Sequence, residues 1–217
     1  MYTLTDSYIL LNDLRFHYRY CGDAPAGRPI LLLHGLASNA RIWDLVAPRL
    51  ADRYRVFALD QRGHGLTDKP DDGYDFNTIV RDALAFVEAM SLERPVLVGH
   101  SWGANVVLHY AATRAVGPNA PSAIGLVDGG VHSLGATGMT WEQTAEMLRP
   151  PPLAGTPREV FIERMKGFVP DPTMITPQII EIVLGNFEIL PDDTIRPRLT
   201  LERHLAILRA LYDQNVA

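Results

Sequence analysis

A serine flanked by glycines gives the clearest chemical signal in the sequence. The run Gly99-His-Ser-Trp-Gly103 directly follows the apolar run Pro95–Val98 and opens a helical stretch over residues 102–115. A tight turn from strand to helix holds a serine hydroxyl out at the carboxyl edge of a sheet, and it needs small residues two positions before and after the serine. Both positions are glycine here. The pattern therefore predicts that Ser101 is a nucleophile in acyl transfer.

A second motif can supply the donors that acyl transfer requires. Leu33-His-Gly-Leu36 lies at the end of an apolar run that begins at Ile30. Negative charge that develops in the transition state is stabilised by two fixed N–H groups, each worth about 3 kcal/mol. We expect the backbone N–H groups of Leu36 and Trp102 to form this pair. We interpret His34 as a buried imidazole that bridges loop backbone rather than as a proton-transfer group.

The elements that position these residues predict an α/β fold. Two short β-rich runs, 8–11 and 15–20, are joined by Asn12-Asp13 and predict an antiparallel hairpin. Unbroken apolar runs predict strands that are covered on both faces; these are Ile30–Leu33, Arg55–Leu59, Pro95–Val98 and Ala123–Val127. Helical stretches alternate with them over residues 40–50, 76–90 and 102–115. This alternation predicts a mostly parallel sheet with helices on both faces.

The pattern changes from Val131 onward, where we expect no strand. The sequence becomes rich in Pro and Met, and four helices are expected over Thr140–Leu148, Thr156–Phe168, Thr176–Phe187 and Thr200–Tyr212. Two of them begin Thr-Pro, which is typical of an N-cap followed by proline at the first helical position.

Three motifs together give the sequence a family resemblance. His34-Gly35, the run Asp60–Pro70 (DQRGHGLTDKP) and Gly99–Gly103 occur in the order and spacing of the α/β-hydrolase superfamily. The sequence resembles its branch of small serine-nucleophile esterases and carbon–carbon bond hydrolases over about residues 8–130. The resemblance implies cleavage of an ester, thioester, amide or C–C bond in a small molecule through an acyl-enzyme, without a cofactor. Serine at position 101 points away from the halide and epoxide chemistries of relatives that carry aspartate there.

The resemblance also implies a domain division. We expect an α/β-hydrolase core over 1–130, a helical lid over 131–200 and a lid-exit helix over 201–217. In the family the triad acid and histidine usually follow the lid. We therefore expect the last core strands to be absent from these 217 residues and activity to be weak or absent. Ala123–Val127 would then be an exposed edge strand, open to a second copy or to a complementing chain.

Candidates for the acid and the base are few. Asp128 follows the strand Ala123–Val127, where some family members place the acid, but it could equally form a turn before Gly129. His109 lies roughly 12 Å along the helix from Ser101, which is too far for a hydrogen bond. His132 is close in sequence to Asp128, which disfavours it as the base, and His204 reads as a packing residue. The candidate site residues are the nucleophile Ser101, the acid Asp128, the oxyanion donors Leu36 and Trp102, and the neighbouring His34, Gly35, Gly99, His100 and Gly103.

Composition narrows the remaining function classes. The net charge is −5, and the basic residues are scattered, so we expect neither a nucleic-acid partner nor a membrane partner. The single cysteine, Cys21, argues against a thiolate metal site and favours the cytoplasm. We expect no metal. The alternative to an enzyme is a non-catalytic relative that holds a small apolar ligand beneath a lid rich in methionine and phenylalanine.

Overall fold

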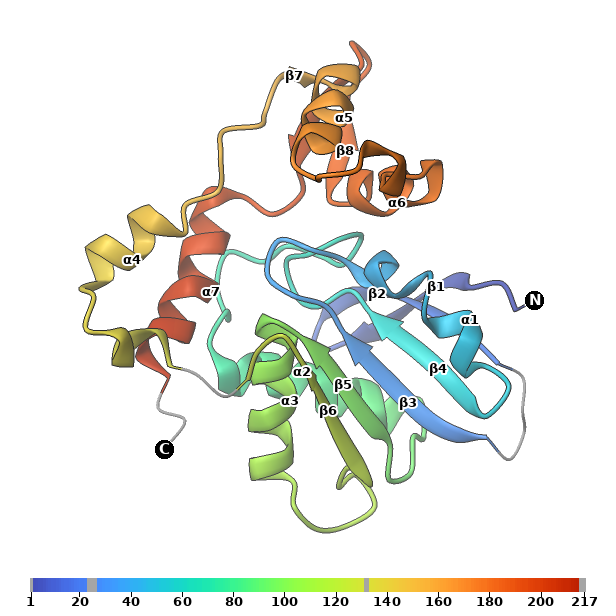
Figure 1. The fold of residues 1–217 in the computed structure, drawn as a ribbon. Helices are drawn as coiled ribbons and strands as arrows, with labels where there is room; N and C mark the ends of the chain where they lie inside the picture. Colours follow the sequence, from blue (N-terminus) through green and yellow to red (C-terminus); the bar gives the residue numbers. More distant parts are fainter. Residues whose placement is uncertain (1, 23–26, 131–132, 215–217) are drawn as a thin grey trace.

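The computed structural model describes residues 2–22, 27–130 and 133–214. A six-stranded sheet with the order β1-β2-β4-β3-β5-β6 forms its centre (Figure 1). The strands are β1 (Thr5–Leu11), β2 (Leu14–Cys21), β3 (Arg28–Leu33), β4 (Tyr54–Leu59), β5 (Val96–His100) and β6 (Ala123–Val127). β4, β3, β5 and β6 run parallel, whereas β1 and β2 are antiparallel neighbours. The predicted α/β class is confirmed.

The hairpin turn follows from its two residues. Asn12 and Asp13 both have positive φ, 50° and 62°, and the strands pair directly beyond them at Leu11 and Leu14. Positive φ at both central positions is the requirement of a two-residue turn that matches the twist of the strands, and Asn and Asp tolerate it. The predicted hairpin is therefore confirmed.

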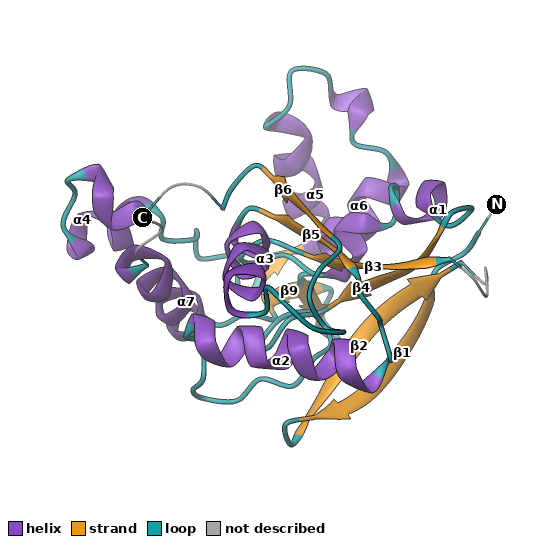
Figure 2. Cartoon of the chain, turned by 90° about the horizontal axis from the view of Figure 1, so that it is seen from below, coloured by secondary structure: helices purple, strands orange, loops and turns teal. Residues whose placement is uncertain are grey.

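Side chains of the central strands alternate between two cores. Leu31 and Leu33 of β3 pack with α2 (Phe76–Ala89) and α3 (Trp102–Thr113) on one face. Ile30 and Leu32 pack on the opposite face with the 3-10 helix η1 (Ala40–Trp43) and the short helix α1 (Ala47–Leu50). Figure 2 shows α2 and α1 on opposite sides of the strands. Burial on both faces explains the unbroken apolar runs Ile30–Leu33 and Val56–Leu59.

The first helical stretch differs from the prediction. Residues 40–50 do not form one helix, because η1 ends at Trp43 and α1 begins at Ala47. Trp43 and Ala47 are both buried against β3 and β4, and Pro48 stands in the first turn of α1. Proline is favoured at a helix start and lacks the N–H that a continuous helix would need. The prediction of a single helix is therefore wrong.

Residues 134–200, called the cap segment from here on, contain helices and a small sheet. The helices are η2 (Leu134–Thr137), α4 (Trp141–Met147), α5 (Arg158–Gly167), η3 (Pro172–Met174) and α6 (Pro177–Leu184), and α7 (Leu201–Asp213) follows. The strands β7 (Thr156–Pro157), β8 (Phe187–Ile189) and β9 (Thr194–Pro197) pair antiparallel in the order β7-β9-β8. Figure 1 shows α5, α6 and β8 grouped beside the large sheet, with α4 against α7.

The expectation of no strand after Val131 is wrong. Phe187 and Ile195 are buried with Phe161 of α5 in a core of their own, which these short strands close. Thr156-Pro157 pairs with β9 instead of capping a helix, so α5 begins only at Arg158. Thr176-Pro177 behaves as predicted, since the Thr176 hydroxyl accepts from the Ile179 N–H at 3.3 Å. Propensity alone could not distinguish the two Thr-Pro pairs.

β6 lies at one edge of the large sheet, and α7 packs against the core. β6 is an edge strand of the described sheet, and its Ile124 and Val127 are 41% and 43% exposed. α7 returns to the core, where Ile207 is fully buried and Gln214 accepts from the Asn105 amide at 2.9 Å. Among the described residues, no helix combines the length and the apolar character needed to cross a bilayer.

Candidate active site

The turn between β5 and α3 holds Ser101 in a strained conformation. Ser101 has φ 51° and ψ −120°, and its N–H donates to the Val127 carbonyl at 2.8 Å. A Cβ atom on Gly99 would lie 2.1 Å from the Gly103 carbonyl oxygen, and one on Gly103 would lie 2.5 Å from that of Leu33. Both positions therefore require glycine. Strain of this kind persists where the surroundings fix it and is typical of functional sites.

The loop after β3 lies against this turn. A Cβ atom on Gly35 would lie 3.1 Å from the Ser101 Cβ and 3.1 Å from the His100 Nδ1. The amide N–H groups of Leu36 and Trp102 have no hydrogen-bond acceptor within the described part of the chain. Trp102 is the first residue of α3, where backbone N–H groups are left without helical partners. Ser101 and the two predicted donors are thus brought to one place.

His34 bridges loop backbone. Its ring is fully buried, Nδ1 donates to the Gly35 carbonyl at 2.8 Å, and Nε2 accepts from the Gln61 N–H at 3.0 Å. Burial lowers the pKa of His34, which keeps the ring neutral. These contacts agree with the interpretation of His34 as a residue that shapes the loop. The His100 Nδ1 is buried without a partner among the described residues.

The Asp60–Pro70 loop is organised around a buried carboxylate. Asp60 accepts from the Ala40 N–H at 2.6 Å, the Leu66 N–H at 2.8 Å and the His17 Nδ1 at 2.7 Å. Burial alone would raise the pKa of Asp60, but the His17 hydrogen bond and nearby charges outweigh it and lower the pKa. A Cβ atom on Gly65, whose φ is 48°, would lie 2.0 Å from the Asp60 Oδ2.

His64 connects that loop to the turn at Ser101. Its Nδ1 donates to the Arg62 carbonyl at 2.9 Å, and its Nε2 accepts from the Ala37 N–H at 3.3 Å. The ring stacks on Trp102 with centroids 5.2 Å apart. Burial lowers the pKa of His64 to about 3, so the ring is neutral. Both ring nitrogens are used by backbone groups, which suits a structural role.

A buried ion pair fixes the loop to α2. Arg62 donates to Asp82 through Nε at 2.7 Å and Nη2 at 3.0 Å, and Asn12 of the hairpin donates to the same carboxylate at 2.8 Å. Two parallel N–H···O bonds give this pair a defined orientation as well as strength.

No acid or base is joined to Ser101 within the described residues. The register pairs His100 with Val127, so Asp128 follows next to Ser101, but its side chain is exposed and hydrogen bonds to no described residue. His132 lies outside the described residues. His109 stacks on Phe76 with centroids 4.3 Å apart. His204 is buried, as expected of a packing residue, and its Nε2 donates to the Leu148 carbonyl at 3.2 Å.

A cavity of about 860 Å³ lies between the core loops and the cap segment. Residues of the core line one side of it, and residues of the cap segment and α7 line the other; the core residues are Ala37, Ser38, His64, Gly65 and Lys69. Its charged lining residues are Lys69, Arg149, Glu188, Arg196, Arg198 and Arg203. None of these six residues was predicted from the sequence as a site residue. Lys69 lies in the Asp60–Pro70 motif, but the other five lie in segments whose packing cannot be predicted from a local pattern.

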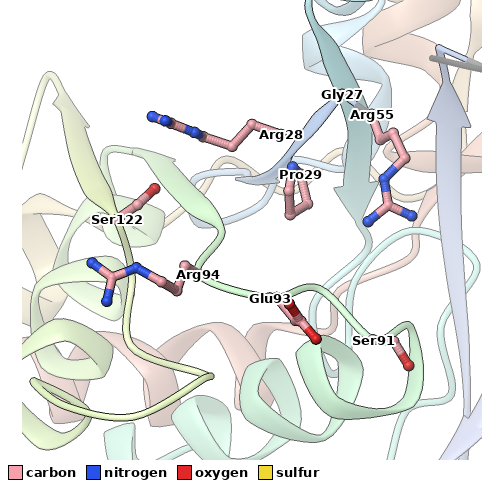
Figure 3. A pocket seen from close by; sticks show the side chains of 8 residues that line it. All are labelled: Gly27, Arg28, Pro29, Arg55, Ser91, Glu93, Arg94 and Ser122. Atoms are coloured by element: carbon pink, nitrogen blue, oxygen red, sulfur yellow. The ribbon is translucent and has the colours of Figure 1, made fainter. Parts of the chain in front are cut away.

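A smaller pocket of about 410 Å³ lies near the amino ends of the parallel strands. Arg28, Arg55 and Arg94 line it, and Figure 3 shows the guanidinium group of Arg55 directed away from those of Arg28 and Arg94. The three cations therefore do not converge on one point. Within the described ranges, His, Cys, Asp and Glu side chains form no group of three that could hold a metal ion.

Comparison with known proteins places this geometry in a family. A family model described as alpha/beta hydrolase fold matches residues 28–160. A 2-(acetamidomethylene)succinate hydrolase from Mesorhizobium japonicum is 40% identical over 79 residues, 36% of this chain and 28% of the relative. A soluble epoxide hydrolase from a Corynebacterium species is 33% identical over 108 residues, 50% of this chain and 37% of the relative.

Structural similarity extends over more of the chain. The crystal structure of E-2-(acetamidomethylene)succinate hydrolase matches with a TM-score of 0.75 and 22% identity, covering 96% of this chain and 73% of that one. The matches to the two curated relatives span 28% and 37% of their own lengths. The family model covers the parallel strands β3 to β6, and the solved structure matches 96% of the chain. The chain therefore belongs to the α/β-hydrolase fold family.

Proposed function

We propose that Ser101 is the nucleophile of a serine hydrolase that forms an acyl-enzyme with a small-molecule substrate. The observation that carries this proposal is the backbone of Ser101, at φ 51° and ψ −120° between β5 and α3, with glycine enforced on both sides. Attack of the hydroxyl on a carbonyl carbon forms a tetrahedral intermediate, and collapse of that intermediate expels the leaving group. Water then releases the acid. The bond cleaved is an ester, thioester, amide or C–C bond.

The N–H groups of Leu36 and Trp102 support the proposal as an oxyanion site. They have no acceptor among the described residues; Trp102 directly follows Ser101, and Gly35 places the loop that carries Leu36 against Ser101. Fixed donors of this kind stabilise the charge that appears only in the transition state. In the proposal the cap segment acts as a lid over the cavity and closes it from water.

The described residues place no acid or base within hydrogen-bond distance of Ser101 for proton transfer. Asp128 remains a candidate for the acid, because its backbone neighbours Ser101. Without a base at hydrogen-bond distance a serine hydroxyl is weakly nucleophilic, and only the acceleration due to binding and the oxyanion donors remains. With no such base among the described residues, we expect slow turnover. A non-catalytic relative that holds a ligand in the 860 Å³ cavity is the alternative.

Covalent labelling distinguishes the two functions. An activated alkyl fluorophosphonate should modify the chain once, at Ser101, as measured by intact mass and peptide mapping. Ser101→Ala should abolish the label, whereas Ser91→Ala, which changes an exposed serine near the amino ends of the strands, should retain it. Labelling no faster than that of Ser101→Ala would refute the nucleophile and leave the binding function.

A further inference from the structure

The cavity under the cap segment combines apolar walls with an excess of cations. The proline run 150–152, Leu153, Leu199 and Leu201 supply apolar surface. The cations are Lys69, Arg149, Arg196, Arg198 and Arg203. Among the described lining residues Glu188 is the sole carboxylate, and Arg196 holds it at 2.5 Å. Glu188 also interacts electrostatically with Arg198 and Lys69, so one carboxylate faces five cations and a net positive charge remains in the cavity.

Most of these cations have partners. Arg149 pairs with Glu146 at 3.2 Å, outside the cavity. Arg203 donates to the carbonyls of Lys69 and Pro70, each at 2.9 Å, and pairs with Asp71 at 3.0 Å. The contacts of Arg203 have a structural role, because they join α7 to the Asp60–Pro70 loop.

Arg198 differs from them. Among the described residues, its buried Nε has no hydrogen-bond partner and its guanidinium group forms no ion pair within 4 Å. Its backbone is fixed, because the Arg198 N–H donates to the Asn186 carbonyl at 2.9 Å. A guanidinium presents its donors in a rigid planar fork that matches a carboxylate, and a buried donor without an acceptor is unfavourable.

Lys69 lines the same cavity as Arg198 and adds a second positive charge. Its Nζ donates to the carbonyls of Gly65 and Thr67 at 2.9 and 2.7 Å, which leaves one of its three N–H groups without a described partner. Burial lowers the pKa of Lys69, and the positive charge of Arg198 lowers it further. Two neighbouring cations that disfavour each other would both be stabilised by one anion between them.

We propose that Arg198 and Lys69 form a carboxylate subsite, so that the cavity takes an apolar molecule that carries a carboxylate. A monoanion fits this pair better than a phosphate dianion, which needs more donors than the two groups offer beside apolar walls. The substrate class that follows, an ester, thioester, amide or ketone with a free carboxylate, rests on the proposed hydrolase function. The subsite itself does not.

Binding measured by isothermal titration calorimetry tests the subsite without requiring catalysis. The probes are 4-phenylbutyrate and its uncharged analogue 4-phenylbutyramide, titrated into the full chain and into Ser101→Ala. We expect both proteins to bind the carboxylate at least tenfold more tightly than the amide, and the preference to fall as salt rises. Equal affinities, no binding of the carboxylate, or tighter binding of phenyl phosphate would overturn the proposal. Because Ser101→Ala is included, the binding result can be interpreted even if Ser101 proves not to be a nucleophile.

Two arginine variants locate the site. Arg198→Gln should weaken 4-phenylbutyrate binding by about tenfold to a hundredfold, which is the range for loss of a charged hydrogen-bond partner. Arg198→Lys keeps the charge without the fork and should give an intermediate loss. Arg55→Gln is the matched control, because its Nε is also buried without a partner but lies at the opposite pocket. Unchanged affinity in Arg198→Gln, or an equal loss in Arg55→Gln, would refute the assignment.

Discussion

Replacement of Asp60 by asparagine should destabilise the fold strongly, because three donors face this carboxylate. The backbone N–H groups of Ala40 and Leu66 and the ring of His17 all direct hydrogens at it. An amide offers one oxygen, and its NH₂ group would face the Leu66 N–H. Loss of a buried charged partner and one buried donor left unpaired together amount to about 3–5 kcal/mol in the free energy of unfolding.

The loss should depend on pH in a defined way. The pKa of Asp60 is lowered from 3.8, so its contribution is present above that value and is lost as the pH falls through the lower folded pKa. The pKa of His17 is raised, because its hydrogen bonds to Asp60 and Asp6 outweigh burial; that contribution is present below 6.5 and is lost as the pH rises through the folded pKa. The destabilisation should therefore be largest between about pH 4 and 6.5.

Urea unfolding of wild type and Asp60→Asn at pH 6 and pH 9 measures this difference. Asp6→Asn is the control, because Asp6 also binds His17 but its side chain is 50% exposed, and it should lose less than about 1 kcal/mol. A loss below about 1 kcal/mol for Asp60→Asn at pH 6, or a greater loss at pH 9 than at pH 6, would contradict the role given to this carboxylate.

Three further substitutions test other parts of the structure. Gly103→Ala should prevent folding or cost several kcal/mol in urea unfolding, because its Cβ would lie 2.5 Å from backbone oxygen. Gly167→Ala, at an exposed helical position with nothing within 4 Å, should instead stabilise by about 0.5–1 kcal/mol, and destabilisation would show a contact that the structure lacks. If β6 is an association edge as we propose, the chain should form dimers or larger species in size-exclusion chromatography with light scattering, and Ile124→Lys should make it monomeric; an unchanged profile would exclude that edge.

The core could be predicted from the sequence because its signals are local. Unbroken apolar runs, the Asn12-Asp13 pair and the glycines around Ser101 each constrain the backbone of their own neighbourhood. The interpretation of His34 as a loop-shaping residue stays a prediction, with which its hydrogen bonds to the Gly35 carbonyl and the Gln61 N–H agree. These elements agree with each other and with the parallel topology, which is why the prediction succeeded for the fold.

The cap segment and the cavity could not be predicted, because their structure depends on contacts distant in sequence. β8 and β9 exist to bury Phe187 and Ile195 against α5, and short strands of three or four residues carry little periodicity. Arg198 looks like any loop arginine in the sequence. Its importance comes from the absence of a partner among the described residues, which only the three-dimensional arrangement reveals.

Hydrogen bonds join the core loops to the cap segment on one flank of the cavity and to α7 on another. Asn39 donates to Asn186 and to the Ile182 carbonyl of the cap segment, and Arg203 of α7 donates to the carbonyls of Lys69 and Pro70. The proline run 150–152 has no backbone N–H groups that could donate hydrogen bonds to the core. If a ligand occupies the cavity as proposed, we expect it to enter beside these prolines. Loss of either set of hydrogen bonds should change the rate at which a ligand dissociates more than its contacts within the cavity.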